Sequence, residues 1–100
     1  MMKFGLTQSQ YDFINSTVFN PVLECGGSLW CFGSRARGDY KKFSDLDLLI
    51  VGESTKLPDL IGSLTETLQE SNFPFKVDLV LESRLAKSYL KDIDLEKVLW

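Results

Sequence analysis

Three aspartates lie in or beside runs of strand-forming residues, which makes them the first candidates for chemistry. Asp45 and Asp47 are two residues apart at the start of one aliphatic run, and Asp78 interrupts another. Residues two apart in a strand point to the same face of a sheet. Aspartate is disfavoured in strands, and like charges held on one face repel each other. If the two strands are neighbours in register, Asp78 joins the other two carboxylates.

Three carboxylates gathered on a sheet predict either a bound cation or raised pKa values. Oxygen ligands in this number suit magnesium or manganese. The alternative is that Asp45 lies in the turn before the strand, while Asp47 and Asp78 lie on a solvated face. The Asp-x-Asp pair alone favours neither interpretation, because short acidic patterns are common.

A glycine and a serine precede the acidic pair by ten residues and suggest a phosphate-binding turn. Gly33 and Ser34 follow an apolar run, and Arg35 and Arg37 can form the first turn of a short helix that Gly38 ends. Glycine allows close backbone approach, serine can cap the helix, and the free amides of a helix start attract phosphate. Both arginines add permanent charge. The alternative is a capped helix with solvated arginines.

The composition excludes several other kinds of site. The sequence has 100 residues and a net charge of -3, from 11 Lys and Arg against 14 Asp and Glu. This length predicts one domain, and the acidic balance argues against direct nucleic-acid binding. Histidine is absent from the sequence, which excludes histidine bases and Cys/His zinc sites within it. Cys25 and Cys31 are expected to be small hydrophobic residues rather than a disulfide.

The sequence gives no signal for secretion or membrane insertion. Residues 1–11 lack the apolar core of a signal peptide, and the aliphatic run over 48–51 is far shorter than the ~20 residues that span a bilayer. We therefore expect a cytoplasmic protein that does not contact a membrane.

Helices and strands alternate along the chain. Thr7 and Gln10 form a capping box behind Leu6 and predict a helix over 8–19 that Asn20 and Pro21 stop. Apolar runs predict strands over 28–32, 45–51 and 75–81, with a short fourth strand over 98–100. Helices are expected from residue 58 to about 70 and from a capping serine at 83 to 89 or 90. This order predicts an α/β (α+β) domain with helices packed on one sheet of three to four strands.

The segments Gly33-Ser34-Arg35-Ala36-Arg37-Gly38 and Ser44-Asp45-Leu46-Asp47-Leu48 resemble the signature of the polymerase-beta-like nucleotidyltransferase superfamily. The residue types and the spacing of the motif are similar to those of the minimal nucleotidyltransferases of this superfamily, the MNT antitoxin type. The resemblance covers nearly the whole chain, from the first predicted helix through Asp78. It implies a mixed sheet and a single minimal nucleotidyltransferase domain over residues 1–100.

The resemblance also implies roles for particular residues. The catalytic, metal-holding acids would be Asp45, Asp47 and Asp78, with two magnesium ions expected and manganese as an alternative. The groups that contact the triphosphate of ATP would be Gly33, Ser34 and Arg37. The implied reaction is in-line attack of an acceptor hydroxyl on the α-phosphate, with pyrophosphate leaving and Asp78 taking the proton.

The expected acceptor is a partner protein. Larger members of the superfamily use additional domains to hold their acceptors, and we expect none within these 100 residues. The resemblance implies a HEPN-domain toxin as partner in a hetero-oligomer, with AMP transferred to one of its tyrosines by an antitoxin. Two alternatives stay open: an antitoxin or nucleotide sensor that acts by occlusion without catalysis, and a small-molecule nucleotidyltransferase.

Overall fold

A four-stranded mixed sheet forms the centre of the structure, a computed structural model that describes residues 3–100. The strand order is β3-β2-β1-β4, with bounds Ser28–Phe32 (β1), Leu46–Val51 (β2), Val77–Leu81 (β3) and Val98–Leu99 (β4). β1 runs antiparallel to β2 and to β4, whereas β2 and β3 are parallel. The predicted mixed sheet with packed helices is confirmed.

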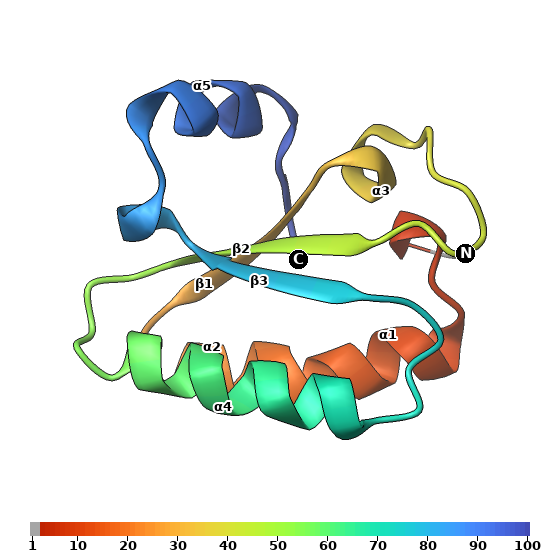
Figure 1. The fold of residues 1–100 in the computed structure, drawn as a ribbon, viewed down its shortest axis with the longest axis horizontal. Helices are drawn as coiled ribbons and strands as arrows, with labels where there is room; N and C mark the ends of the chain where they lie inside the picture. The colour runs from red at the N-terminus through yellow and green to blue at the C-terminus, as the bar shows by residue number, and fades with distance from the viewer. Residues whose placement is uncertain (1–2) are drawn as a thin grey trace.

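The two faces of the sheet are covered by different helices (Figure 1). Below the sheet in this view lie α1 (Gln8–Ile14), α2 (Asn20–Glu24) and α4 (Leu57–Glu70). Above it lie α5 (Lys87–Glu96) and the short α3 (Ser34–Arg37), which follows β1 directly. None of the helices described over residues 3–100 is long and apolar enough to cross a membrane.

The main core lies between the sheet and the three lower helices. Alternate residues of β2 point into it, and Leu46, Leu48 and Ile50 are fully buried there. The α4 helix contributes four buried residues at helical spacing, Leu57, Ile61, Leu64 and Leu68. Because alternation sends the intervening strand residues to the other face, Asp47 lies on the side of α3 and α5.

The first helical segment is longer than predicted. The predicted capping box is present, since Thr7 Oγ1 accepts from Gln10 N–H and Gln10 Oε1 accepts from Thr7 N–H. The predicted stop at Asn20 and Pro21 is wrong, because a π turn over Asn15–Phe19 leads into α2. Asn20 N–H bonds to the carbonyl five residues back. Pro21 then lies in the first turn of α2, where a missing N–H costs little.

The last helix is displaced from its predicted place. Residues Glu82–Arg84 form a 3-10 turn instead of a capped helix, and α5 begins at Lys87 with Ala86 as N-cap. The turn carries the chain from the end of β3 to the upper face of the sheet (Figure 1). As a result, the helix runs to Glu96 rather than ending at residue 89 or 90.

Trp100 joins the two ends of the described chain. Its ring stacks on Tyr11 and Phe4 at centroid distances of 4.8 and 5.3 Å, and its Nε1 donates to Asn15 Oδ1 at 2.7 Å. Its backbone N–H donates to the Leu29 carbonyl at 2.9 Å, which extends the pairing of β1 with β4. These contacts fix β4 beside β1, directly after α5.

Candidate active site

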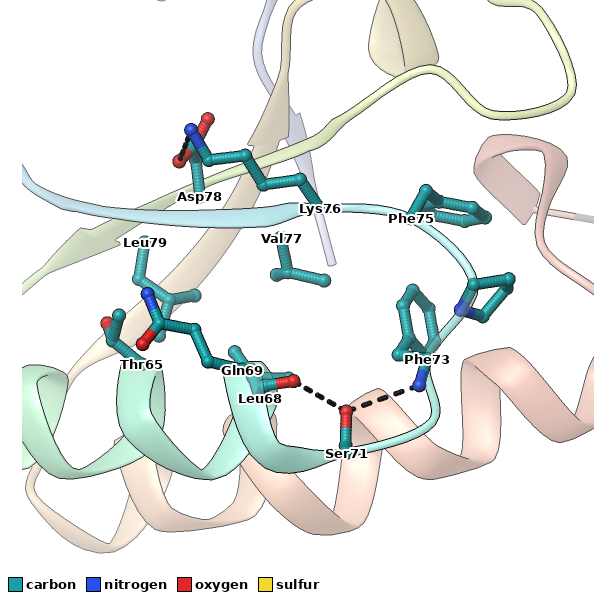
Figure 2. A pocket seen from close by; sticks show the side chains of 11 residues that line it. Thr65, Leu68, Gln69, Ser71, Phe73, Phe75, Lys76, Val77, Asp78 and Leu79 are labelled. Atoms are coloured by element: carbon teal, nitrogen blue, oxygen red, sulfur yellow. Dashed lines mark hydrogen bonds and ion pairs between the residues drawn. The ribbon is translucent and has the colours of Figure 1, made fainter.

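The parallel pairing of β2 and β3 brings two of the predicted acids together. Asp47 is the register partner of Asp78, so both side chains lie on the same face. Figure 2 shows Asp78 on the side of β3 opposite to Val77 and Leu79, which point toward α4. Lys76 lies on the same side, with its Nζ 3.3 Å from Asp78 Oδ1.

Asp45 lies just before β2 rather than in it. The pairing of β2 with its neighbour begins at Leu46, whose N–H donates to the Lys76 carbonyl at 2.9 Å. The predicted strand start at residue 45 is therefore wrong, and Asp45 lies before the strand, as the alternative had it, although the turn itself ends earlier, at residue 43. Asp45 and Asp47 nevertheless line the same cavity, of about 540 Å³.

Asp47 is the acid whose protonation is most affected by its surroundings. Burial raises its pKa to about 6, and the charges of Asp78 and Asp45 add to this effect. Within residues 3–100, no three carboxylates or thiolates converge closely enough to hold a metal ion as they stand. The geometry brings Asp47 against Asp78, and Asp45 stands in the adjacent loop.

Gly33 forms the turn between β1 and α3 and lies against Asp47. Its φ of 75° is a left-handed conformation that favours glycine, and a Cβ at this position would overlap Asp47 Oδ2. The N-cap of α3 is Gly33, so the prediction of a serine cap is wrong and Ser34 is the first helical residue. Gly38 ends the helix, as predicted, and it does so in the left-handed conformation.

The two arginines of α3 have different environments. Arg35 is only 2% exposed, and its guanidinium donates to the carbonyls of Phe4, Gly5, Lys42 and Ser44 at 3.0–3.4 Å. It also lies over the Phe75 ring at 3.9 Å from the centroid. The expectation that Arg35 adds charge at a phosphate site is wrong, because all of these contacts hold the protein's own backbone and core together.

Arg37 points instead to the cavity that Asp45 and Asp47 line. Its Nη1 lies 2.7 Å from Glu96 Oε2, and its Nε lies 3.3 Å from Asp39 Oδ2. The pKa of Arg37 is raised, mainly by its hydrogen bond to Glu96 and to a smaller extent by its hydrogen bond to Asp39. The other Glu96 oxygen, Oε1, accepts from Gly33 N–H at 3.1 Å.

The α5 helix adds four residues to this cavity that the sequence did not predict. They are Tyr89, Asp92, Ile93 and Glu96. The predicted helix ended before three of them, and no local pattern links Glu96 to a glycine 63 residues away. The one signal in the sequence was the helical spacing of Leu90 and Ile93, which could have extended the predicted helix through Ile93.

A second hollow, of about 430 Å³, lies between the C-terminal part of α4 and β3 (Figure 2). Its lining includes Leu68 and Phe73, and Ser71 Oγ donates a hydrogen bond to the Leu68 carbonyl at 2.6 Å. Asp78 is the one acid in its lining. Asp45, Asp47, the Gly33 turn and Arg37 line the cavity on the side of α5, whereas Asp78 lines this second hollow and meets Asp47 through the pairing of β2 with β3.

Comparisons with known proteins place the chain in a family. The sequence profile of the nucleotidyltransferase domain family matches residues 19–100. The chain is 43% identical over 53 residues to the probable protein adenylyltransferase MntA of Haemophilus influenzae. That match covers 53% of this chain, and the chain spans about half, 46%, of the length of that relative.

Two solved structures share the fold. One, assigned as a minimal nucleotidyltransferase, superposes with a TM-score of 0.62 at 28% identity and covers 93% of this chain and 95% of its own. The other is a toxin-antitoxin crystal structure with AMP-PNP, with a TM-score of 0.66 at 18% identity, covering 86% of this chain and 72% of its own. The profile match, the MntA relative and the minimal nucleotidyltransferase structure confirm the resemblance drawn from the motif, and the chain belongs to the nucleotidyltransferase domain family as one of its minimal, MNT-type members.

Proposed function

We propose that this chain is a magnesium-dependent nucleotidyltransferase that moves AMP from ATP to a tyrosine hydroxyl of a HEPN-type partner protein. In this proposal residues 1–100 form one minimal nucleotidyltransferase domain. It acts as the antitoxin of a toxin-antitoxin pair within a hetero-oligomer.

The observation that carries the proposal is the meeting of Asp47 with Asp78 directly beside the Gly33 turn. The two acids are register partners on the open face, and the Gly33 backbone lies against the Asp47 carboxylate. A metal-binding acid pair and a phosphate-binding turn must adjoin in any site that holds a metal-bound triphosphate.

The donor set fits a divalent cation. Asp45, Asp47 and Asp78 offer hard oxygen ligands. Burial, together with the charges of Asp78 and Asp45, raises the pKa of Asp47, and a bound cation would offset this effect. We assign magnesium to these three residues. Bound there, magnesium would neutralise the triphosphate and lower the pKa of the acceptor hydroxyl.

The remaining steps belong to the protein's own groups. Gly33 N–H and the start of α3 bind phosphate oxygens, Ser34 offers its hydroxyl, and Arg37 stabilises the charge of the leaving pyrophosphate. Asp78 accepts the proton of the attacking hydroxyl. The α-phosphate bond to this oxygen forms as the bond to pyrophosphate breaks.

The names of relatives support the choice of nucleotide and acceptor. The Haemophilus relative is named a protein adenylyltransferase, which supports transfer of AMP to a protein. The toxin-antitoxin structure contains AMP-PNP, an ATP analogue, on a shared fold. The HEPN identity of the partner and the tyrosine acceptor rest on the resemblance of the motif.

The test is transfer of label from ATP to a HEPN protein encoded beside this chain. The wild type with magnesium should label the partner, and the double variant Asp45→Asn with Asp47→Asn should lose at least roughly 100-fold of that rate. Asp59→Asn, an exposed acid in the first turn of α4, is the matched control and should retain full transfer. Undiminished transfer by the double variant would contradict the proposal. Protection from the toxin by an unreactive double variant would instead support occlusion.

A further inference from the structure

We propose that Glu96 is a built-in competitor of the nucleotide: its carboxylate occupies the phosphate-binding groups of the empty site, and α5 must release it before a triphosphate binds. This inference rests on the proposed function, because it takes Gly33 and Arg37 as phosphate-binding groups.

Both oxygens of the Glu96 carboxylate accept hydrogen bonds from groups that the proposed function assigns to phosphate binding. Oε1 accepts from Gly33 N–H at 3.1 Å, and Oε2 accepts from Arg37 Nη1 at 2.7 Å. A backbone amide at a helix start together with a guanidinium is the combination that recognises phosphate oxygens. A carboxylate and a phosphate group are both negatively charged hydrogen-bond acceptors, so they compete for these donors.

The helix itself gives no reason for an acid at this position. Glu96 is the last residue of α5, where the carbonyl end of the helix dipole disfavours negative charge. The next residue, Lys97, directs its Nζ to Asp94 Oδ1 at 2.7 Å and not to Glu96. The contacts with Gly33 and Arg37 therefore hold the Glu96 carboxylate in place.

The packing of α5 permits its release. Ile93 is its one buried side chain, whereas Tyr89 and Leu95 are 66% and 85% exposed. A helix that buries so little apolar surface moves at a small cost in free energy. Because Tyr89, Asp92 and Ile93 line the same cavity, release of Glu96 also changes the cavity next to Asp45 and Asp47.

The first experiment compares ATP affinities by calorimetry with magnesium present. Glu96→Gln removes the competing charge at nearly constant shape, and it should tighten ATP binding by roughly 3- to 10-fold, the effect of losing one partly exposed ion pair. Asp94→Asn removes the same charge from the same helix outside this cavity, and its affinity should stay within about twofold of the wild type. Unchanged or weaker ATP binding by Glu96→Gln would overturn the inference.

A second readout follows the helix itself. Hydrogen exchange of the α5 amides in the wild type should become faster when ATP is added, while α4 keeps its protection. Glu96→Gln should show the faster α5 exchange before ATP is added. Slower or unchanged α5 exchange in the wild type with ATP bound would overturn the inference.

The variant Arg37→Ala separates this inference from the proposed function. If Arg37→Ala binds ATP more weakly and Glu96→Gln does not bind it more tightly, Arg37 still belongs to the phosphate site but Glu96 does not compete with the nucleotide. Failure of both the wild type and Glu96→Gln to bind ATP would refute the competition and the proposed function together.

Discussion

Gly33 is the residue at which the backbone and the acidic site depend on each other most directly. Its φ of 75° turns the chain from β1 into α3, and its missing side chain leaves the space that Asp47 Oδ2 occupies. Its N–H meanwhile points to the Glu96 carboxylate. Glycine is required here both for the backbone conformation and for the close approach of a carboxylate.

Substitution of this glycine should therefore cost more than backbone strain alone. Gly38 gives a comparison, because its φ of 94° and ψ of 2° lie in the left-handed helical region and a Cβ there meets no atom within 4 Å, whereas Gly33, with a ψ of -159°, is in a region that is essentially restricted to glycine. We expect Gly38→Ala to lower the free energy of unfolding by about 1 kcal/mol and Gly33→Ala by about 2 kcal/mol or more. Chemical denaturation would measure both values. Equal losses would contradict both the backbone conformation and the close approach of Asp47 described for Gly33.

At the scale of the element, α3 assigns different tasks to two arginines two residues apart. Arg35 is buried and binds the carbonyls of segments before and after the helix, including Phe4 and Ser44. Arg37 lies at the surface of the cavity and pairs with Glu96. A helix of four residues cannot be stable alone, so Arg35 supplies the fixed position from which Arg37 and Gly33 act.

The two arginines should respond differently to the same conservative change. Arg35→Lys keeps the charge but loses the planar fork that reaches several carbonyls, so we expect a loss of about 2–3 kcal/mol in unfolding free energy. Arg37→Lys should change stability by less than about 0.5 kcal/mol, because exposed ion pairs contribute little, and should weaken ATP binding. Denaturation and calorimetry on both variants would check this. A stable Arg35→Lys protein would contradict the anchoring role.

Elements set by neighbouring residues could be predicted from the sequence, and those set by distant contacts could not. The capping box at Thr7 and the glycine end of α3 depend on residues within one turn, and both were correct. The continuation through Pro21 depends on a π turn, and the start of α5 depends on the path around the sheet edge. Neither has a short sequence signal.

The candidate site divides in the same way. The sequence could state that Asp47 and Asp78 would meet if their strands were neighbours in register, and the parallel pairing of β2 with β3 fulfils that condition. The burial of Arg35 and the contact of Glu96 with Gly33 depend on segments 31 and 63 residues apart. Such pairings follow only from the assembled fold.

At the scale of the whole molecule, the sheet separates a face that packs the main core from a face that carries the Asp47–Asp78 pair beside apolar residues such as Leu49. The lower face is sealed by α1, α2 and α4, whereas the upper face combines the Asp47–Asp78 pair with a lightly packed helix (Figure 1). Because the net charge is already -3, few basic groups are free to offset these acids, and Lys76 is the cation that lies beside Asp78. The stability of the fold is thereby linked to the protonation of its site.

This linkage predicts a fold that loses stability as pH rises, in buffer without divalent metal. The folded protein keeps the Asp47 proton up to a pKa of about 6, whereas the unfolded chain releases it near the ordinary value of 3.8, so the folded state binds more protons between these values. Stability present below about pH 4 is therefore lost as pH rises through 6. Allowing for the solvent exposure of Asp47, we expect this loss to be on the order of 1 kcal/mol.

Asp47→Asn should then gain stability over the wild type between pH 4 and pH 7, as measured by urea denaturation at each pH. Magnesium should restore the wild type above pH 6 and leave Asp47→Asn unchanged. Parallel pH profiles for the wild type and Asp47→Asn would show that burial and the neighbouring acids do not raise the pKa of Asp47 in the folded protein.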